Sequence, residues 1–171
     1  MNATAARPPA EIGPGLRRLM LIGGGAVGVL SAVAVARGLS GLAPSHLSPK
    51  EVAVIVHIAA VLPAVPLGLY ILLTRKGGAR HRLLGRVWML LMLTTALSAL
   101  FIRHINHGQF SWIHLFVPLA IVTMVRAIAA ARQGRIGDHK RHMAGMYLGA
   151  LILPGLFTFL PGRLMWMWLV G

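Results

Sequence analysis

Five long apolar stretches, separated by short basic segments, dominate the sequence. Each is close to the length of about 20 residues that an α-helix needs to cross the hydrocarbon core of a bilayer. The stretches are Arg18 to Ala36, Val52 to Leu73, Leu83 to Ile102, Ile113 to Ala131 and Met143 to Leu160. The pattern predicts an all-α, polytopic membrane helix bundle with five transmembrane helices.

The two ends of the chain differ from these stretches. Residues 1–16 are rich in alanine and proline, which predicts a disordered N-terminal tail ahead of a single transmembrane domain over 17–171, with core helices within 52–160. The segment Leu164 to Val170 is too short to cross and holds two tryptophans, so we expect it to lie at a membrane interface. A cleavable signal peptide is the alternative for the first stretch, because Arg17 and Arg18 precede it and small residues end it.

The composition supports a membrane protein. Hydrophobic residues make up 57% of the chain and charged residues 12%, whereas a water-soluble domain is about 25% charged. The net charge of +14 comes from 17 Lys+Arg against 3 Asp+Glu, a balance that in a soluble chain suggests nucleic-acid binding. Here the apolar stretches make the positive-inside rule the better explanation, so the expected partner is the lipid bilayer and not nucleic acid.

The basic residues lie mainly on one side of the predicted bundle. Eleven fall in the N-tail, between stretches two and three, or between stretches four and five: Arg7, Arg17, Arg18, Arg75, Lys76, Arg80, Arg82, Arg132, Arg135, Lys140 and Arg141. Four fall on the other side: Arg37, Lys50, Arg103 and Arg163. This bias predicts a multi-pass protein of an inner (cytoplasmic) membrane with its N-terminus in the cytoplasm and its C-terminus outside.

The scarcity of reactive side chains restricts the possible chemistry. The chain has no cysteine, which excludes disulfides, iron–sulfur clusters and covalently attached c-type haem. Its only carboxylates, Glu11, Glu51 and Asp138, lie outside the apolar stretches, so an intramembrane carboxylate relay or a paired-carboxylate site has no residues to use. Eight histidines remain as candidates.

The histidines form two predicted layers. His57 lies within the second stretch on the outer side, and His114 begins the fourth stretch on that side. On the inner side His81 precedes the third stretch, and either His139 or His142 precedes the fifth. Two imidazoles on facing helices are the axial ligands that a b-type haem needs, so each layer is a candidate haem b site with histidine as the iron ligand.

The other polar residues have simpler alternatives. Arg86 and Arg126 lie within the inner ends of their helices, where each either extends to a lipid phosphate or pairs with a haem propionate. Asp138 is expected to cap the fifth helix, or to orient His139 or His142. We expect His46, His104 and His107, in the outer loops, to lie among headgroups or to bond loop carbonyls.

Two strings carry a resemblance to a known family. They are His81-Arg82-Leu83-Leu84-Gly85-Arg86 and Gly137-Asp138-His139-Lys140-Arg141-His142-Met143, with His114-Leu115 between them. Over roughly Val52 to Leu160 the chain resembles the uncharacterised bacterial family of predicted membrane proteins whose core is a four-helix, histidine-bearing bundle. The resemblance implies that fold and no activity. Because the family pattern has an aromatic residue where this chain has His142, the resemblance favours His139 as the inner ligand.

Three functions compete on this basis. Ligands on helices two and four, and on three and five, resemble in architecture the di-haem b-type cytochromes that pass electrons across membranes. The first hypothesis is therefore a transmembrane cytochrome or electron-transfer subunit, with a redox partner. The second is a non-enzymatic accessory or assembly subunit of a larger membrane complex, in which the histidines are structural. A transporter is less favoured, because no intramembrane carboxylate is present to neutralise a cation. A quinone or a bound lipid beside either layer fits all three, and enzymatic activity stays open.

Overall fold

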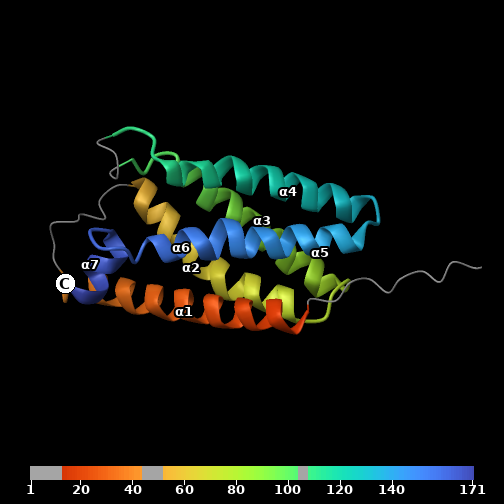
Figure 1. The fold of residues 1–171 in the computed structure, drawn as a ribbon, viewed down its shortest axis with the longest axis horizontal. Coiled ribbons are helices and arrows are strands. Elements are labelled where there is room, and N and C mark those ends of the chain that lie inside the picture. The colour runs from red at the N-terminus through yellow and green to blue at the C-terminus, as the bar shows by residue number, and fades with distance from the viewer. Residues whose placement is uncertain (1–12, 44–51, 104–107) are drawn as a thin grey trace, which may run out of the picture.

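The computed structural model describes residues 13–43, 52–103 and 108–171, and within these ranges the regular structure is entirely helical. Three long helices come first: α1 (Pro14–Leu39), α2 (Val52–Leu73) and α3 (Ala79–Ala99). A 3₁₀ turn, η2 (Trp112–Leu115), leads into α4 (Phe116–Arg132). Figure 1 shows these helices running side by side along the length of the molecule.

The last helical stretch is made of several segments. It begins with α5 (Ile136–Gly145), continues as the π-helical segment η3 (Met146–Ile152) and finishes as α6 (Leu153–Phe157). A short helix, α7 (Leu164–Val170), ends the chain. In Figure 1, α5 and α6 lie along one line parallel to α4.

Within the described ranges, four helices are long and apolar enough to cross a membrane, which confirms a polytopic helical membrane protein. They are Pro14–Leu39, Val52–Leu73, Ala79–Ala99 and Trp112–Arg132. The fifth predicted stretch is divided among α5, η3 and α6 and does not form one regular α-helix of that length.

The third and fifth helices begin earlier in the sequence than predicted. The third helix begins at Ala79 rather than Leu83, and the fifth stretch begins at Ile136 rather than Met143. In both places the helix continues past its apolar window into basic residues, because backbone hydrogen bonding does not require apolar side chains. The tail predicted over 1–16 is helical from Pro14, and its first twelve residues lie outside the described ranges.

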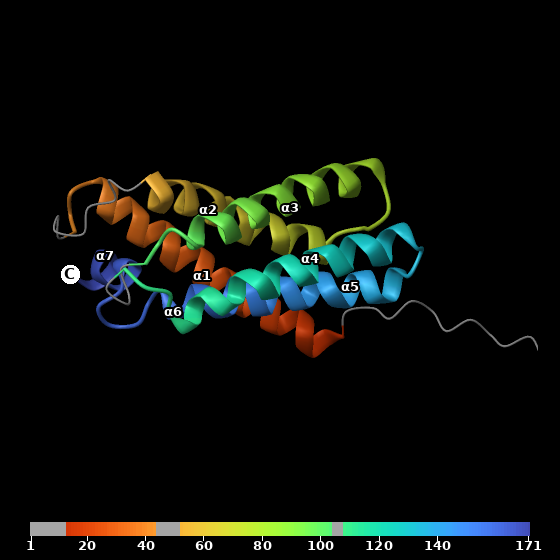
Figure 2. The same ribbon diagram turned by 90° about the horizontal axis from the view of Figure 1, so that it is seen from above.

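Helices α2, α3, α4 and the α5–η3 stretch surround a common centre. Contacts join α2 to α3, α3 to α4, α4 to α5, and η3 back to α2, while α1 packs on α2 and η3 from outside. Figures 1 and 2 show that α2 and α4 finish, and α3 and α5 begin, at the same end of the molecule. We call this the basic end, because its turns and the helix ends beside them hold Arg75, Lys76, Arg80, Arg82, Arg132, Arg135, Lys140 and Arg141. We call the opposite end, where α7 lies, the distal end.

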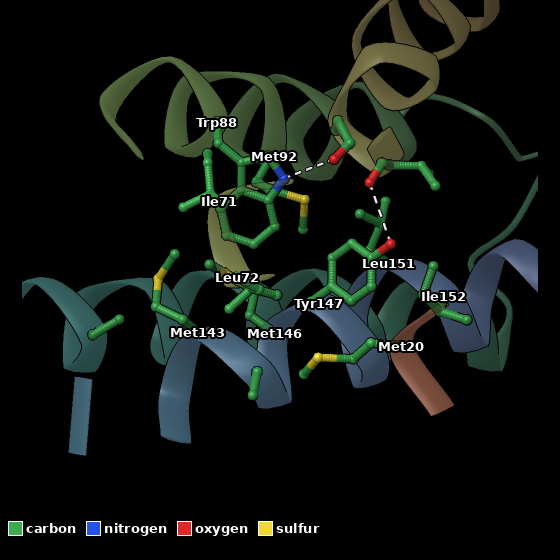
Figure 3. Packing of buried hydrophobic residues seen from close by; sticks show 14 of the residues in the cluster. Met20, Ile71, Leu72, Trp88, Met92, Met143, Met146, Tyr147, Leu151 and Ile152 are labelled. Atoms are coloured by element: carbon green, nitrogen blue, oxygen red, sulfur yellow. Dashed lines mark hydrogen bonds between the residues drawn. The ribbon is translucent and has the colours of Figure 1, made fainter. Parts of the chain in front are cut away.

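Two large aromatic side chains fill the centre of this bundle. Trp88 of α3 and Tyr147 of η3 are both 0% exposed and project into the space between their helices (Figure 3). The indole Nε1 of Trp88 donates to the carbonyl of Ala64 over 2.8 Å, and the Tyr147 hydroxyl donates to the carbonyl of Val65 over 3.2 Å. Both polar groups are therefore satisfied by α2, which avoids the cost of an unpaired donor in a membrane interior.

Glycines in α1 and α2 allow these close approaches. A Cβ added at Gly68 would lie 2.5 Å from Nε1 of Trp88 and 2.8 Å from the ring of Tyr147, and one at Gly24 would collide with the Tyr147 hydroxyl. By contrast, no described atom lies within 4 Å of a Cβ added at Gly145 or at Gly149.

The C-terminal helix packs on the end of α1. Trp168 is 3% exposed and lies against Gly38, where an added Cβ would come within 2.5 Å of its ring. Nε of Arg37 donates to the Trp168 carbonyl over 3.0 Å. The Trp168 ring therefore packs α7 against α1, and the location of this segment at a membrane interface stays a prediction.

Candidate functional site

At the basic end the structure brings together histidines from two different helices. His81 is in the first turn of α3 and His139 in the first turns of α5, and both are half-buried. Both helices begin at the basic end, on opposite sides of the bundle centre.

A backbone hydrogen bond fixes the His139 ring. Its Nδ1 lies 2.9 Å from the carbonyl oxygen of Ala127 in α4. A carbonyl only accepts hydrogen bonds, so Nδ1 carries the hydrogen and Nε2 is left with the lone pair. This is the arrangement in which metal-ligating histidines are usually held, with one nitrogen donating to the protein and the other directed at the metal.

His81 has an unsatisfied ring nitrogen. Its Nδ1 is buried and has no hydrogen-bond partner among the described residues. A buried polar atom normally has a partner, and the exceptions are often explained by a ligand or an ordered molecule in the functional state. The His81 imidazole therefore has bonding capacity that the described protein does not use.

The neighbouring candidates at this end are engaged differently. The His142 ring is half-buried and makes no hydrogen bond among the described residues. Asp138 was expected to cap the fifth helix or to orient a histidine, and both expectations are wrong. The helix begins at Ile136, which places Asp138 inside its first turn, and its carboxylate pairs with Arg135 at 3.0 Å and Arg141 at 3.6 Å.

Arg86 and Arg126 lie on the outside of the bundle. Both residues are exposed, and neither forms an ion pair with a described residue. Their exposure favours the alternative in which each side chain extends along the apolar surface toward lipid phosphates. The positive charges near the two histidines therefore come from the basic residues of the turns at this end.

At the distal end His57 is bound to α3. Its Nδ1 lies 3.0 Å from the carbonyl of Thr95 and 3.1 Å from Oγ of Ser98. Nδ1 again carries the hydrogen, because the Thr95 carbonyl only accepts. The Ser98 hydroxyl in turn donates to the carbonyl of Thr94 over 2.7 Å. Oγ1 of Thr95 is buried and has no partner among the described residues.

His114, unlike His57, is bonded to a residue of its own turn and not to another helix. It is 8% exposed and lies in η2, where the backbone N–H of Ser111 donates to its Nδ1 over 3.0 Å and completes a capping box at the start of the fourth helix. The carbonyl oxygen of Ser111 lies 3.1 Å from the same Nδ1 and can only accept, so the two backbone contacts favour different tautomers. Nε2 is buried and has no partner among the described residues. Phe110 packs edge-on against the imidazole at 5.0 Å between ring centroids. His114 therefore helps to cap the N-terminus of this helical segment.

The two distal histidines take part in separate networks. The hydrogen bonds of His57 go to α3, those of His114 go to Ser111 at the start of η2, and α3 packs against both α2 and α4. Sequence reasoning did not identify the partners of either ring. Thr95 and Ser98, three residues apart in an apolar helix, were the only signal for the first partner, and Ser111, three residues before His114, was the signal for the second. His46, His104 and His107 lie outside the described residues.

The donor set at the basic end suits an iron held by two ligands. Within the described ranges no group of three or more His, Asp or Glu side chains is arranged to hold a metal ion. A b-type haem needs only two axial nitrogens, since the porphyrin supplies the other four. The open Nε2 of His139 and the unsatisfied His81 ring fit that requirement. The distal pair is not brought onto one network, since His57 is bonded to α3 and His114 to Ser111 of its own turn.

Comparison with known proteins places the sequence in a family. The model of a family described as predicted membrane protein (DUF2306) matches residues 54–167, which covers the bundle from α2 to α7. No curated protein and no solved structure matches the chain.

Proposed function

Because the chain belongs to this family of predicted membrane proteins, whose description gives no activity, we propose its function from the site: a transmembrane b-type cytochrome or electron-transfer membrane subunit. The haem is held at the basic end by His81 and His139. The observation that carries the proposal is the hydrogen bond from Nδ1 of His139 to Ala127, because it fixes a ring whose other nitrogen is open at the same end of the bundle as the unsatisfied His81 imidazole.

The chain's own residues would position the group and shield it. A bound haem b supplies reversible one-electron transfer. The Ala127 carbonyl sets the tautomer of His139, and Trp88 fills the bundle deeper along the same axis and separates the basic end from the distal half. The positive turns would stabilise an anionic redox partner docked at this end. The proposal is confined to the basic end, because the hydrogen bonds of His57 and His114 belong to separate networks.

We further propose that the α5–η3–α6 stretch is a fifth span, with the N-terminus and the basic end in the cytoplasm of a bacterium. The stretch runs alongside α4 from the basic end to the distal end in both views. The concentration of cations at one end supports the orientation through the positive-inside rule. A topology reporter fused after Gly171 should be active outside the cytoplasm, and one inserted at Gly134 should be active inside. The reverse pattern would overturn the orientation.

The visible absorption spectrum tests whether the protein binds haem. Purified protein should show the Soret and α bands of a low-spin b-type haem, with one haem per chain by the pyridine haemochrome assay. His81→Ala and His139→Ala should each lose it, while His142→Ala, the matched control three residues from His139, should keep it. If both single variants keep the full haem content, His81 and His139 are not the haem ligands.

A second function has a specific observation in its favour. Trp88 and Tyr147 fill the bundle centre, and His57 and His114 are used in structural hydrogen bonds. These features suit a non-enzymatic accessory or assembly subunit. A wild-type protein without haem, expressed in a haem-sufficient host, would make this reading the preferred one.

A further inference from the structure

Three aromatic rings form a cluster at the distal end of the bundle. The indole of Trp112 in η2 packs edge-on against the ring of Phe157 at the end of α6, with 4.7 Å between ring centroids and 85° between ring planes. Phe116, in the first turn of α4, lies 6.4 Å from each of these rings. The aromatic cluster of Trp112, Phe116 and Phe157 therefore joins the start of the fourth helix to the end of the fifth stretch.

Trp112 differs from the other three tryptophans of the chain in its exposure. It is 50% exposed, whereas Trp88 and Trp168 are buried and Trp166 is half-buried. The indole N–H of Trp112 makes no hydrogen bond to a described residue. The contact with Phe157 thus holds the Trp112 ring, while its N–H is available to a group outside the described protein.

The surface that continues from Trp112 along α4 is apolar. Leu115, Leu119 and Val122 follow it at intervals of three or four residues, which places them on one helical face, and all three are exposed. The next residue on this face is the exposed Arg126, toward the basic end. An exposed apolar face between a tryptophan and an arginine suits acyl chains along its length and a headgroup region at each end.

The length of this helical segment agrees with the thickness of a bilayer. Trp112–Arg132 is one of the segments long and apolar enough to cross a membrane. Its 21 residues extend about 30 Å at a rise of roughly 1.5 Å per residue, which matches the roughly 30 Å of hydrocarbon in a typical bilayer. Trp112 therefore lies at the distal boundary of the hydrocarbon when Arg132 lies at the opposite boundary.

We propose that the aromatic cluster is an interfacial anchor, which binds the ester and headgroup region of phospholipids in the bilayer leaflet at the distal end. The indole N–H of Trp112 donates to a lipid oxygen there. Tryptophan is enriched at this depth, because the indole combines a large apolar ring with one polar N–H. Since Phe157 packs on the same ring, the anchor fixes the depth of α4 and of the fifth stretch together. The proposal does not depend on haem.

Fluorescence quenching by brominated lipids tests the depth of Trp112. The full-length Trp166→Phe variant is reconstituted in phosphatidylcholine vesicles whose acyl chains carry bromine either near the glycerol or near the terminal methyl group. Bromine quenches only at short range, and Trp88 and Trp168 are buried, so quenching in this variant reports mainly on Trp112. Bromine near the glycerol should quench the fluorescence more strongly than bromine near the methyl group.

The matched control is the double variant Trp112→Phe/Trp166→Phe. It keeps an aromatic ring in the cluster and removes only the reporter, and far-UV circular dichroism would verify that it keeps the helical fold. Its remaining fluorescence should lose most of the sensitivity to bromine at both depths. Equal quenching in the control and in the single variant would overturn the proposal, because the signal would then come from tryptophans other than Trp112.

The two bromine depths separate the headgroup region from the other possible surroundings of Trp112. Stronger quenching by bromine near the methyl group would place the ring deep in the hydrocarbon and refute the anchor. Absence of quenching at both depths would also refute it, and aqueous acrylamide would then distinguish a ring in water, which it quenches, from a ring covered by a protein partner or a second copy of the chain. A bound haem would lower the fluorescence equally in both lipids, so the comparison stands whatever the haem assay shows.

Discussion

Replacing Gly68 by alanine tests the packing that holds the bundle together. Gly68 lies in α2 against the two aromatic rings at the bundle centre, and Trp88 is 0% exposed. The new Cβ would lie 2.5 Å from Nε1 and 2.8 Å from Cε2 of Trp88, and 2.8 Å from a ring carbon of Tyr147. Real Cβ atoms do not approach heavy atoms this closely, so either the rings or α2 must move.

Three effects set the magnitude. Alanine is favoured over glycine inside a helix by roughly 0.5–1 kcal/mol. Overpacking a filled core costs about 1–3 kcal/mol. Displacing Trp88 also strains its hydrogen bond to Ala64, a class of bond worth about 0.6 and at most about 1.7 kcal/mol in a membrane helix bundle. The clash outweighs the propensity gain, and we expect a net loss of about 1–3 kcal/mol in the free energy of unfolding.

The assay is equilibrium unfolding by SDS in mixed micelles, followed by far-UV circular dichroism. Gly149→Ala is the matched control, because it adds the same methyl group to the helical stretch where nothing lies within 4 Å. The control should be neutral or slightly stabilising. Equal stability of the two variants would refute the argument that Trp88 and Tyr147 pack on the Gly68 backbone.

A double variant strengthens the test. Phenylalanine at position 88 removes the indole Nε1 and Cε2, the two Trp88 atoms that the Gly68→Ala Cβ would meet most closely. Gly68→Ala should therefore cost at least about 1 kcal/mol less in a Trp88→Phe background than in the wild type, a coupling expected only of residues in contact. Strictly additive free energies would show that the two residues do not meet.

Three further predictions concern other contacts. Tyr147→Phe should lower the free energy of unfolding by about 0.6 kcal/mol in the same SDS assay, because only the hydroxyl contact with Val65 is removed, and a loss above about 2 kcal/mol would contradict a single bond. Gly38→Ala should release α7 from α1 and raise the proteolysis rate near the C-terminus without altering the bundle, and an unchanged cleavage rate would refute the contact with Trp168. His57→Ala should destabilise the distal half by about 1 kcal/mol and leave any haem in place, so haem loss would reassign that residue as a ligand.

The helices could be predicted from the sequence because span length and hydropathy depend on local composition. The ends of α2 were predicted at the observed residues, while α3 begins at Ala79 inside a polar segment that hydropathy assigns to a loop. Hydropathy could not predict that the fifth stretch is divided into α5, η3 and α6. The η3 segment carries Tyr147, whose hydroxyl meets α2, so its form depends on a contact between distant parts of the chain.

The candidate site was predicted only as a set of residue types at certain depths. Depth along a helix placed His81 and His139 at one level, but it carried no information about the partners of each ring. The bond to Ala127 depends on how α4 packs against α5, and the capping of the fourth helix by His114 depends on a 3₁₀ turn that hydropathy does not reveal. Asp138 was assigned to the wrong position in its helix for a related reason, since α5 begins in polar sequence.

The partner of each ring nitrogen separates the two ends of this molecule more clearly than the number of histidines does. At the distal end His57 donates from Nδ1 to α3 and His114 is bonded at Nδ1 to Ser111, so both rings contribute to helix contacts or capping. At the basic end His139 is anchored through one nitrogen with the other open, and His81 has a buried nitrogen without a described partner. Substitutions there should therefore change ligand content with little effect on stability, whereas substitutions of His57 and His114 should change stability with little effect on ligand content.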